Sequence, residues 1–132
     1  MTATFILKKF QHIYIVLNHF PYNPGHLMVV PYRHCAQLYE LTDEEHYETM
    51  KAVSKSSHIL QNALGATGVN VGINLGDKAS GGSIPDHLHV HIVPRWKGDT
   101  SFMPIVANTK PLSRDLQEVF QELEVHFSKF SL

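Results

Sequence analysis

The run His87-Leu88-His89-Val90-His91 places a histidine at every second position. In a β-strand successive side chains point to opposite faces, so the three imidazoles would share one face at a spacing of about 7 Å. The apolar residues between them would point into the core. Imidazole serves as nucleophile, acid, base and metal ligand near neutral pH. The run therefore predicts a reactive site, and two neighbouring rings at this spacing can contact one phosphate group.

The residues alone leave two alternatives open for these histidines. The first is a metal site, since histidines at positions i and i+2 are known zinc ligands, but the nearby carboxylates of Asp77, Asp86 and Asp99 fall in or beyond loops and form no evident cluster. The second is a solvated polar strand face. It accounts poorly for three imidazoles on an otherwise apolar strand, because they would lose hydration with no gain in packing.

The composition is that of one globular domain spanning residues 1–132, because 43% of the residues are hydrophobic and 17% are charged. A chain of this size can fold without disulfides or a structural metal. Cys35 is the only cysteine and no signal peptide is recognisable, so we expect a cytoplasmic protein. No apolar run approaches the roughly 18 residues of a spanning helix, which excludes membrane insertion.

The charge balance restricts the kind of partner. The sequence has 11 Lys and Arg residues against 12 Asp and Glu residues, a net charge of −1 with histidine neutral. This balance excludes a broad basic surface and, with it, a nucleic acid as partner. An anionic ligand would therefore be bound by a local site.

Five strands are expected from short apolar or alternating segments that end at turn residues. Their ranges are residues 5–9, 12–18, 26–31, 69–75 and 87–93. The first two are close enough to form an antiparallel hairpin, and a Gly-rich loop over residues 76–85 precedes the last. Val69, Val71, Ile73 and Leu75 alternate with polar residues, which predicts a half-buried strand.

Two main helices are expected. The capping-box pattern Thr-x-x-Glu at residues 42–45 starts the first, apolar residues then recur every three or four positions up to Leu64, and Gly65 supplies the stop. A second amphipathic helix covers residues 112–130 and begins near a Ser113 cap. Five mostly antiparallel strands and two helices make an α+β domain whose sheet is covered on one face.

Residues 87–93 match the pattern His-φ-His-φ-His-φ-φ, in which φ is an apolar residue, directly after the Gly-rich loop. Further matches are Asn18, Pro24-Gly25-His26, residues 31–34, Asn74 and residues 94–100. On these residues the sequence resembles the histidine triad (HIT) family, in the branch of bacterial diadenosine tetraphosphate phosphorylase-like and hydrolase-like proteins. The resemblance implies a five-stranded antiparallel sheet with two main helices, and a homodimer that joins two such sheets.

The resemblance also implies an enzyme, a nucleotidyl hydrolase or transferase that acts on phosphoanhydride, phosphoester or phosphoramidate bonds to AMP or GMP. Dinucleoside polyphosphates such as diadenosine tetraphosphate are the expected substrates. His89 would attack the α-phosphorus through Nε2 and form a covalent nucleotidyl-histidine. Its Nδ1 proton would be held by the main-chain carbonyl of His87, while His91 would contact the transferred phosphate and assist the leaving group.

The other site residues implied by the resemblance bind the substrate. Gly81, Gly82 and Ser83 would present main-chain amides to the phosphate. Ser83 stands where the fragile histidine triad hydrolases carry glutamine. Asn18 matches the ribose-binding position, and Asn74 would contact a phosphate or sugar at the pocket edge.

We expect no bound metal and no required cofactor. Many relatives build a structural zinc site from an N-terminal Cys-x-x-Cys pair, the histidine after Tyr-Arg and a triad histidine. This chain begins at the first strand and Cys35 alone cannot replace the pair, so His34 is expected to bind no zinc. Any stimulation by Mg²⁺ would act through the polyphosphate substrate.

Hydrolase and phosphorylase differ only in whether water or phosphate resolves the intermediate, and the sequence leaves both open. His91 favours hydrolysis, because the branch with galactose-1-phosphate uridylyltransferase carries glutamine there. Residues 94–96 and 98–104 favour the phosphorylase-like proteins. A nucleotide-binding regulatory protein with weak catalysis and a histidine-ligated metalloprotein are the alternatives from other classes.

Overall fold

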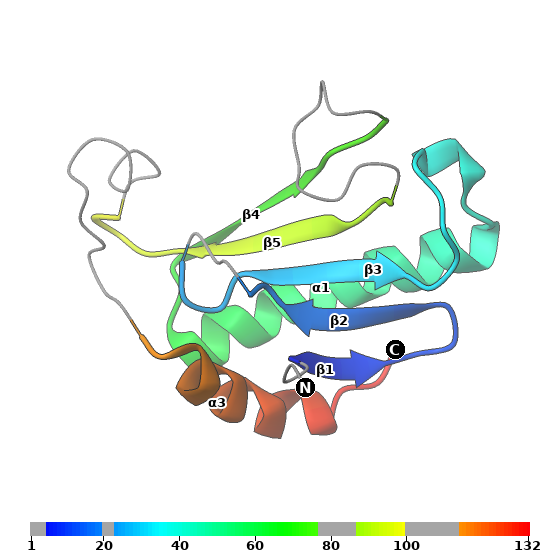
Figure 1. Ribbon diagram of the computed structural model, residues 1–132. Coiled ribbons are helices and arrows are strands. Elements are labelled where there is room, and N and C mark those ends of the chain that lie inside the picture. Colours follow the sequence, from blue (N-terminus) through cyan, green and yellow to red (C-terminus); the bar gives the residue numbers. More distant parts are fainter. Residues whose placement is uncertain (1–4, 20–22, 77–86, 100–113) are drawn as a thin grey trace.

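The computed structural model describes residues 5–19, 23–76, 87–99 and 114–132. In chain order its elements are β1 (Ile6–Lys9), β2 (Ile13–Leu17), β3 (Leu27–Pro31), a 3₁₀ turn (Leu38–Glu40), α1 (Asp43–Leu64), β4 (Gly68–Ile73), β5 (Val90–Arg95) and α3 (Leu116–Ser128). Within these residues five strands form one antiparallel sheet in the order β1-β2-β3-β5-β4 (Figure 1). The predicted α+β class, with a five-stranded antiparallel sheet and two main helices, is confirmed.

The register of the sheet places the histidine region near its middle. β3 pairs with β5 so that Met28 lies opposite His91, and β4 pairs with β5 so that Gly72 lies opposite His91 on the other side. Residues paired directly across strands point to the same face. His91 is therefore held between two neighbouring strands, and its ring stands on the face that Met28 shares.

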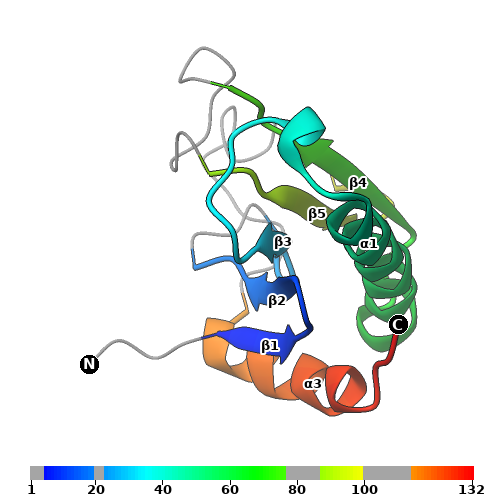
Figure 2. The ribbon, with the colours of Figure 1, turned by 90° about the vertical axis from the view of Figure 1, so that its right-hand side faces the viewer.

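The helices cover one face of the sheet and one of its edges. α1 lies across a face and α3 lies along β1 (Figure 2). Between them is a core of buried apolar side chains that includes Ile13, Ile15, Leu27, Val29, Leu60, Ile92 and Phe127. Because Ile92 points into this core, His91 points away from α1. Neither helix of the described residues is long and apolar enough to cross a membrane.

The ends of α1 are as predicted. The Thr42 hydroxyl accepts the Glu45 amide at 3.1 Å, and the Glu45 carboxylate accepts the Thr42 amide at 2.8 Å, which completes the capping box. Gly65 ends the helix in the left-handed conformation, with φ of 67°. The first three strands are also present, each slightly shorter than its predicted range.

β5 begins and ends later than the strand predicted over residues 87–93, so those bounds are wrong. The predicted alternation is confirmed, since Leu88, Val90 and Ile92 are all buried. The residues before Val90 do not continue the strand, because their main chain forms a hydrogen bond outside the sheet. There the Leu88 amide donates to the Cys35 carbonyl at 2.6 Å.

Two further bounds differ from the predictions. β4 is shorter than residues 69–75, and Val71 is 50% exposed because β4 is an edge strand. α3 begins at Leu116 with Asp115 at its N-cap, because the backbone of Asp115 is still extended. The predicted cap, Ser113, lies outside the described residues.

We predict that Gly25→Ala destabilises the protein more than Gly65→Ala. Both glycines have positive φ, 90° and 67° respectively, which costs a residue with a side chain about 1 kcal/mol or more. A Cβ on Gly25 would also lie 2.5 Å from Cδ1 of Leu64, whereas a Cβ on Gly65 meets nothing within 4 Å. Urea denaturation should show losses of about 2 and about 1 kcal/mol. Equal losses of stability would contradict a close approach between Gly25 and Leu64.

Candidate active site

His89 lies directly before β5 and has one ring nitrogen hydrogen-bonded to the main chain. Its side chain is buried, with the residue 4% exposed, and Nδ1 lies 3.0 Å from the carbonyl oxygen of His87. A carbonyl can only accept, so Nδ1 must carry the proton of the neutral ring. Nε2 then keeps its lone pair. The contact expected from the resemblance is thus present, and it leaves on Nε2 the lone pair that a nucleophile needs.

His91 lies beside His89 and is held by a fourth histidine. The His89 and His91 rings are 4.6 Å apart between centroids, at an angle of 75°. Nε2 of His26, at the start of β3, lies 2.9 Å from Nδ1 of His91. The amide nitrogen of Asn18 in turn lies 3.2 Å from Nδ1 of His26.

These contacts define a direction for the protons. The amide nitrogen of Asn18 also lies 3.5 Å from Nε2 of His26. The shorter contact, with Nδ1, assigns Nδ1 as the acceptor of the amide proton, and Nε2 of His26 then carries the ring proton. That proton is donated to Nδ1 of His91, which leaves the proton of the neutral His91 ring on Nε2. His89 therefore presents a lone pair, and His91 presents a hydrogen-bond donor.

Burial keeps the imidazole rings of His26 and His91 neutral. Burial first, and then the neighbouring His91 and His89, lower the pKa of His26 to about 4. Burial, followed by the effect of His89, also lowers the pKa of His91. At neutral pH both rings are uncharged, so His91 acts as a neutral donor.

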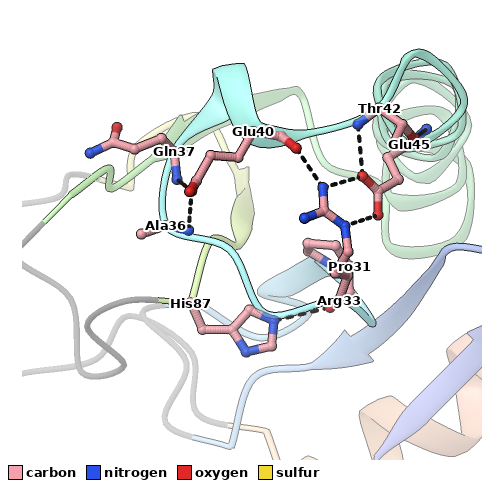
Figure 3. A network of polar contacts seen from close by, with 8 residues as sticks. All are labelled: Pro31, Arg33, Ala36, Gln37, Glu40, Thr42, Glu45 and His87. Atoms are coloured by element: carbon pink, nitrogen blue, oxygen red, sulfur yellow. Dashed lines mark hydrogen bonds and ion pairs between the residues drawn. The ribbon is translucent and has the colours of Figure 1, made fainter.

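His87 contributes its main chain rather than its ring. Its Nε2 donates to the Pro31 carbonyl at 3.0 Å (Figure 3), and its ring centroid is 5.2 Å from that of His34. The main-chain role of His87 is the one expected from the resemblance, and the ring contact with Pro31 is an additional finding. The rings of His89 and His91 form a neighbouring pair, and the His87 ring anchors the chain.

The predicted substrate-binding residues fall into two groups. Asn18 contacts His26, and Asn74 follows the last residue of β4. The second group, Gly81, Gly82 and Ser83, lies outside the described residues. Their roles in binding remain predictions.

No group of three or more His, Cys, Asp or Glu side chains is arranged to hold a metal within residues 5–19, 23–76, 87–99 and 114–132.

His26 is the site residue that sequence reasoning did not single out. It is named only within the Pro24-Gly25-His26 match to the family and as the first residue of a predicted strand, without a role in the site. Its contact with His91 joins residues 65 positions apart, and it depends on the pairing of β3 with β5. Besides that match, the available signal is a histidine in a segment that is otherwise apolar.

Comparison with known proteins identifies the family. Residues 2–98 match the HIT domain. The chain belongs to the HIT family. Among solved structures, a Zn-bound histidine triad family protein from Mycobacterium smegmatis superimposes with a TM-score of 0.78 over 97% of this chain and 86% of that one, at 22% identity. The HIT fold is thereby confirmed.

Two curated relatives of this HIT domain carry names of enzymes. AP-4-A phosphorylase of Mycobacterium tuberculosis is 45% identical over 124 residues, which are 94% of this chain and 63% of that protein. Bis(5′-nucleosyl)-tetraphosphatase (asymmetrical) of Schizosaccharomyces pombe is 38% identical over 81 residues, 61% of this chain and 43% of that protein. The chain spans less than two thirds of the length of either relative.

Acidification should destabilise this HIT domain through His26. Its pKa is about 4 in the folded protein and about 6.5 in an unfolded chain, so the unfolded chain binds the proton first. Stability present above pH 6.5 is lost as pH falls towards 4. Between pH 7.5 and pH 5, urea denaturation should show a loss of about 2 kcal/mol from this group. His26→Gln should show a smaller loss over that interval, and an equal loss would refute the assignment.

Proposed function

We propose that this HIT domain cleaves dinucleoside polyphosphates, such as diadenosine tetraphosphate, through a nucleotidyl intermediate on His89. The observation that carries the proposal is the hydrogen bond from Nδ1 of His89 to the His87 carbonyl at 3.0 Å, because it leaves Nε2 with a lone pair beside the His91 donor. The names of the two curated relatives support the substrate class.

The proposed reaction has two steps. Nε2 of His89 attacks the α-phosphorus, a P–N bond forms, and the P–O bond to the departing nucleotide breaks. The Nε2 proton of His91 is hydrogen-bonded to the leaving oxygen and stabilises the charge that develops there. Water or phosphate then attacks the same phosphorus and breaks the P–N bond, which restores the lone pair on His89.

The substrate would be held mainly by uncharged donors. The main-chain amides of Gly81, Gly82 and Ser83 bind the phosphate in this proposal, Asn18 binds the ribose, and Asn74 lies beside the reacting phosphorus. Such an arrangement suits a chain with a net charge of −1, because aligned amides bind an anion without a basic surface.

Phosphorolysis is the second candidate. It uses the same intermediate with phosphate in place of water, and the 45% identity to AP-4-A phosphorylase favours it. A nucleotide-binding protein with weak catalysis is the alternative outcome of a turnover assay. No cofactor is required in either reaction, and Mg²⁺ acts only through the substrate. Since Cys35 is the only cysteine, we propose that the protein acts in the reducing cytoplasm.

Product analysis tests the proposed reaction. With diadenosine tetraphosphate, AMP plus ATP indicates hydrolysis, and ADP plus ATP formed only with added phosphate indicates phosphorolysis. We expect His89→Ala to lower kcat about a thousandfold or more while AMP binding by calorimetry persists. His126→Ala, at an exposed histidine of α3, is the matched control with wild-type turnover. A His89→Ala enzyme that kept a tenth of wild-type kcat, or activity abolished by EDTA in the absence of added Mg²⁺, would reject the mechanism.

We also propose that the domain is a homodimer joined at β4. This strand is an edge of the sheet, where unpaired main-chain groups can bond to another strand. Val71 of β4 is 50% exposed. Pairing of β4 with its copy would join two sheets and lower this apolar exposure.

Sedimentation at micromolar concentration tests the dimer. We expect about twice the chain mass for the wild type and a monomer for Val71→Lys, because a buried, unpaired charge opposes association. Val125→Lys is the control, since Val125 is 59% exposed on α3, away from β4 in the fold. A monomeric wild type, or the same effect from both variants, would contradict this interface.

A further inference from the structure

The β3–α1 connection, residues 32–42, is held by one arginine and two glutamates (Figure 3). Arg33 donates to the two carboxylate oxygens of Glu45 at 2.8 and 3.2 Å, and also to the main-chain carbonyl of Glu40. The planar guanidinium meets a carboxylate at two points, a geometry that lysine does not reproduce. Arg33 therefore fixes the orientation of the connection against the first turn of α1.

The Glu40 side chain forms hydrogen bonds within the same connection. Its Oε1 accepts the main-chain amides of Ala36 and Gln37, both at 2.9 Å. These amides lower the pKa of Glu40, and the hydrogen bond from Arg33 is the main cause that lowers the pKa of Glu45 to about 2. Both carboxylates are ionised at neutral pH, so all of these contacts are charge-assisted.

Two main-chain carbonyls, one at the end of β3 and one in this connection, accept hydrogen bonds from the histidine segment. The Pro31 carbonyl, at the end of β3, accepts Nε2 of His87 at 3.0 Å. The Cys35 carbonyl accepts the Leu88 amide at 2.6 Å. His87 is thus anchored through its ring and through the peptide that follows it. That peptide contains the carbonyl that accepts Nδ1–H of His89.

We propose that Arg33 and Glu40 are positioning residues that hold the His87 carbonyl at Nδ1 of His89. They act through the connection and not on the substrate. An exposed ion pair contributes little to stability by itself, and the Arg33 side chain is 48% exposed. A purely stabilising role would therefore leave the His89 ring unchanged on its removal. The kinetic consequence rests on the proposed function, whereas the ring tautomer does not.

NMR of the ¹⁵N-labelled histidine rings tests the positioning directly, because ring nitrogen shifts distinguish the two tautomers. Wild-type His89 should show the proton on Nδ1 alone. Arg33→Gln should shift both ring nitrogens of His89 towards a mixture of tautomers and lower kcat about tenfold, with KM within about twofold. Arg33→Lys should give intermediate values, because lysine keeps the positive charge but cannot contact both carboxylate oxygens of Glu45 in the same way.

Two variants complete the design. Arg114→Gln is the matched control, because it also removes an arginine that pairs with carboxylates, Glu118 at 2.8 Å and Glu122 at 2.6 Å, on α3. It should leave the His89 shifts and kcat unchanged. Glu40→Gln removes the charge but keeps an acceptor oxygen, and it should move the His89 shifts in the same direction as Arg33→Gln by a smaller amount.

Arg33→Gln with the His89 shifts and kcat of Arg114→Gln would overturn the positioning role. If Arg33→Gln does not fold, Arg33→Lys and Glu40→Gln carry the comparison, and unchanged His89 shifts in both overturn it equally. A ring shift in a protein that never turns over a dinucleotide would reject the proposed function while retaining the positioning role.

Discussion

The hydrogen bond from Nδ1 of His89 to the carbonyl of His87 is the constraint on which the site depends. A carbonyl has no proton to give, so one ring nitrogen is fixed as the donor and the other keeps its lone pair. The acceptor is a main-chain atom, and its position is therefore set by the path of the chain. The strand pairing that places His91, and the anchors on His87, are the parts of the fold that define this path.

The rings of His26 and His91 are uncharged, whereas the charged contacts of Arg33 lie in the β3–α1 connection. His26 and His91 are kept neutral by burial, which lowers the pKa of each. Burying His26 completely is tolerable because its ring nitrogens meet Asn18 and His91. The same burial is expected to make the fold sensitive to acid, since the unfolded chain takes up a proton on His26 before the folded protein does. The ionised contacts of Arg33 are instead used to hold the chain.

Much of the site could be predicted because its signals are local in sequence. The alternation over residues 87–93 indicated the burial of Leu88 and Ile92 and the pairing of His89 with His91. The capping box at residues 42–45 predicted the start of α1. The bounds of β5 were missed, since a strand begins where a partner strand offers hydrogen bonds, and the periodicity of side chains does not report that.

By itself the sequence determined the elements, the side of the sheet on which the reactive histidines stand, and the family. These follow from periodicity, capping and turn residues, which act over a few positions along the chain. Only the tertiary structure brought His26 to His91, and it alone turned the ring of His87 towards Pro31. Those contacts join residues 65 and 56 positions apart. They depend on which strands pair and in what register, and this is decided by packing of the whole core.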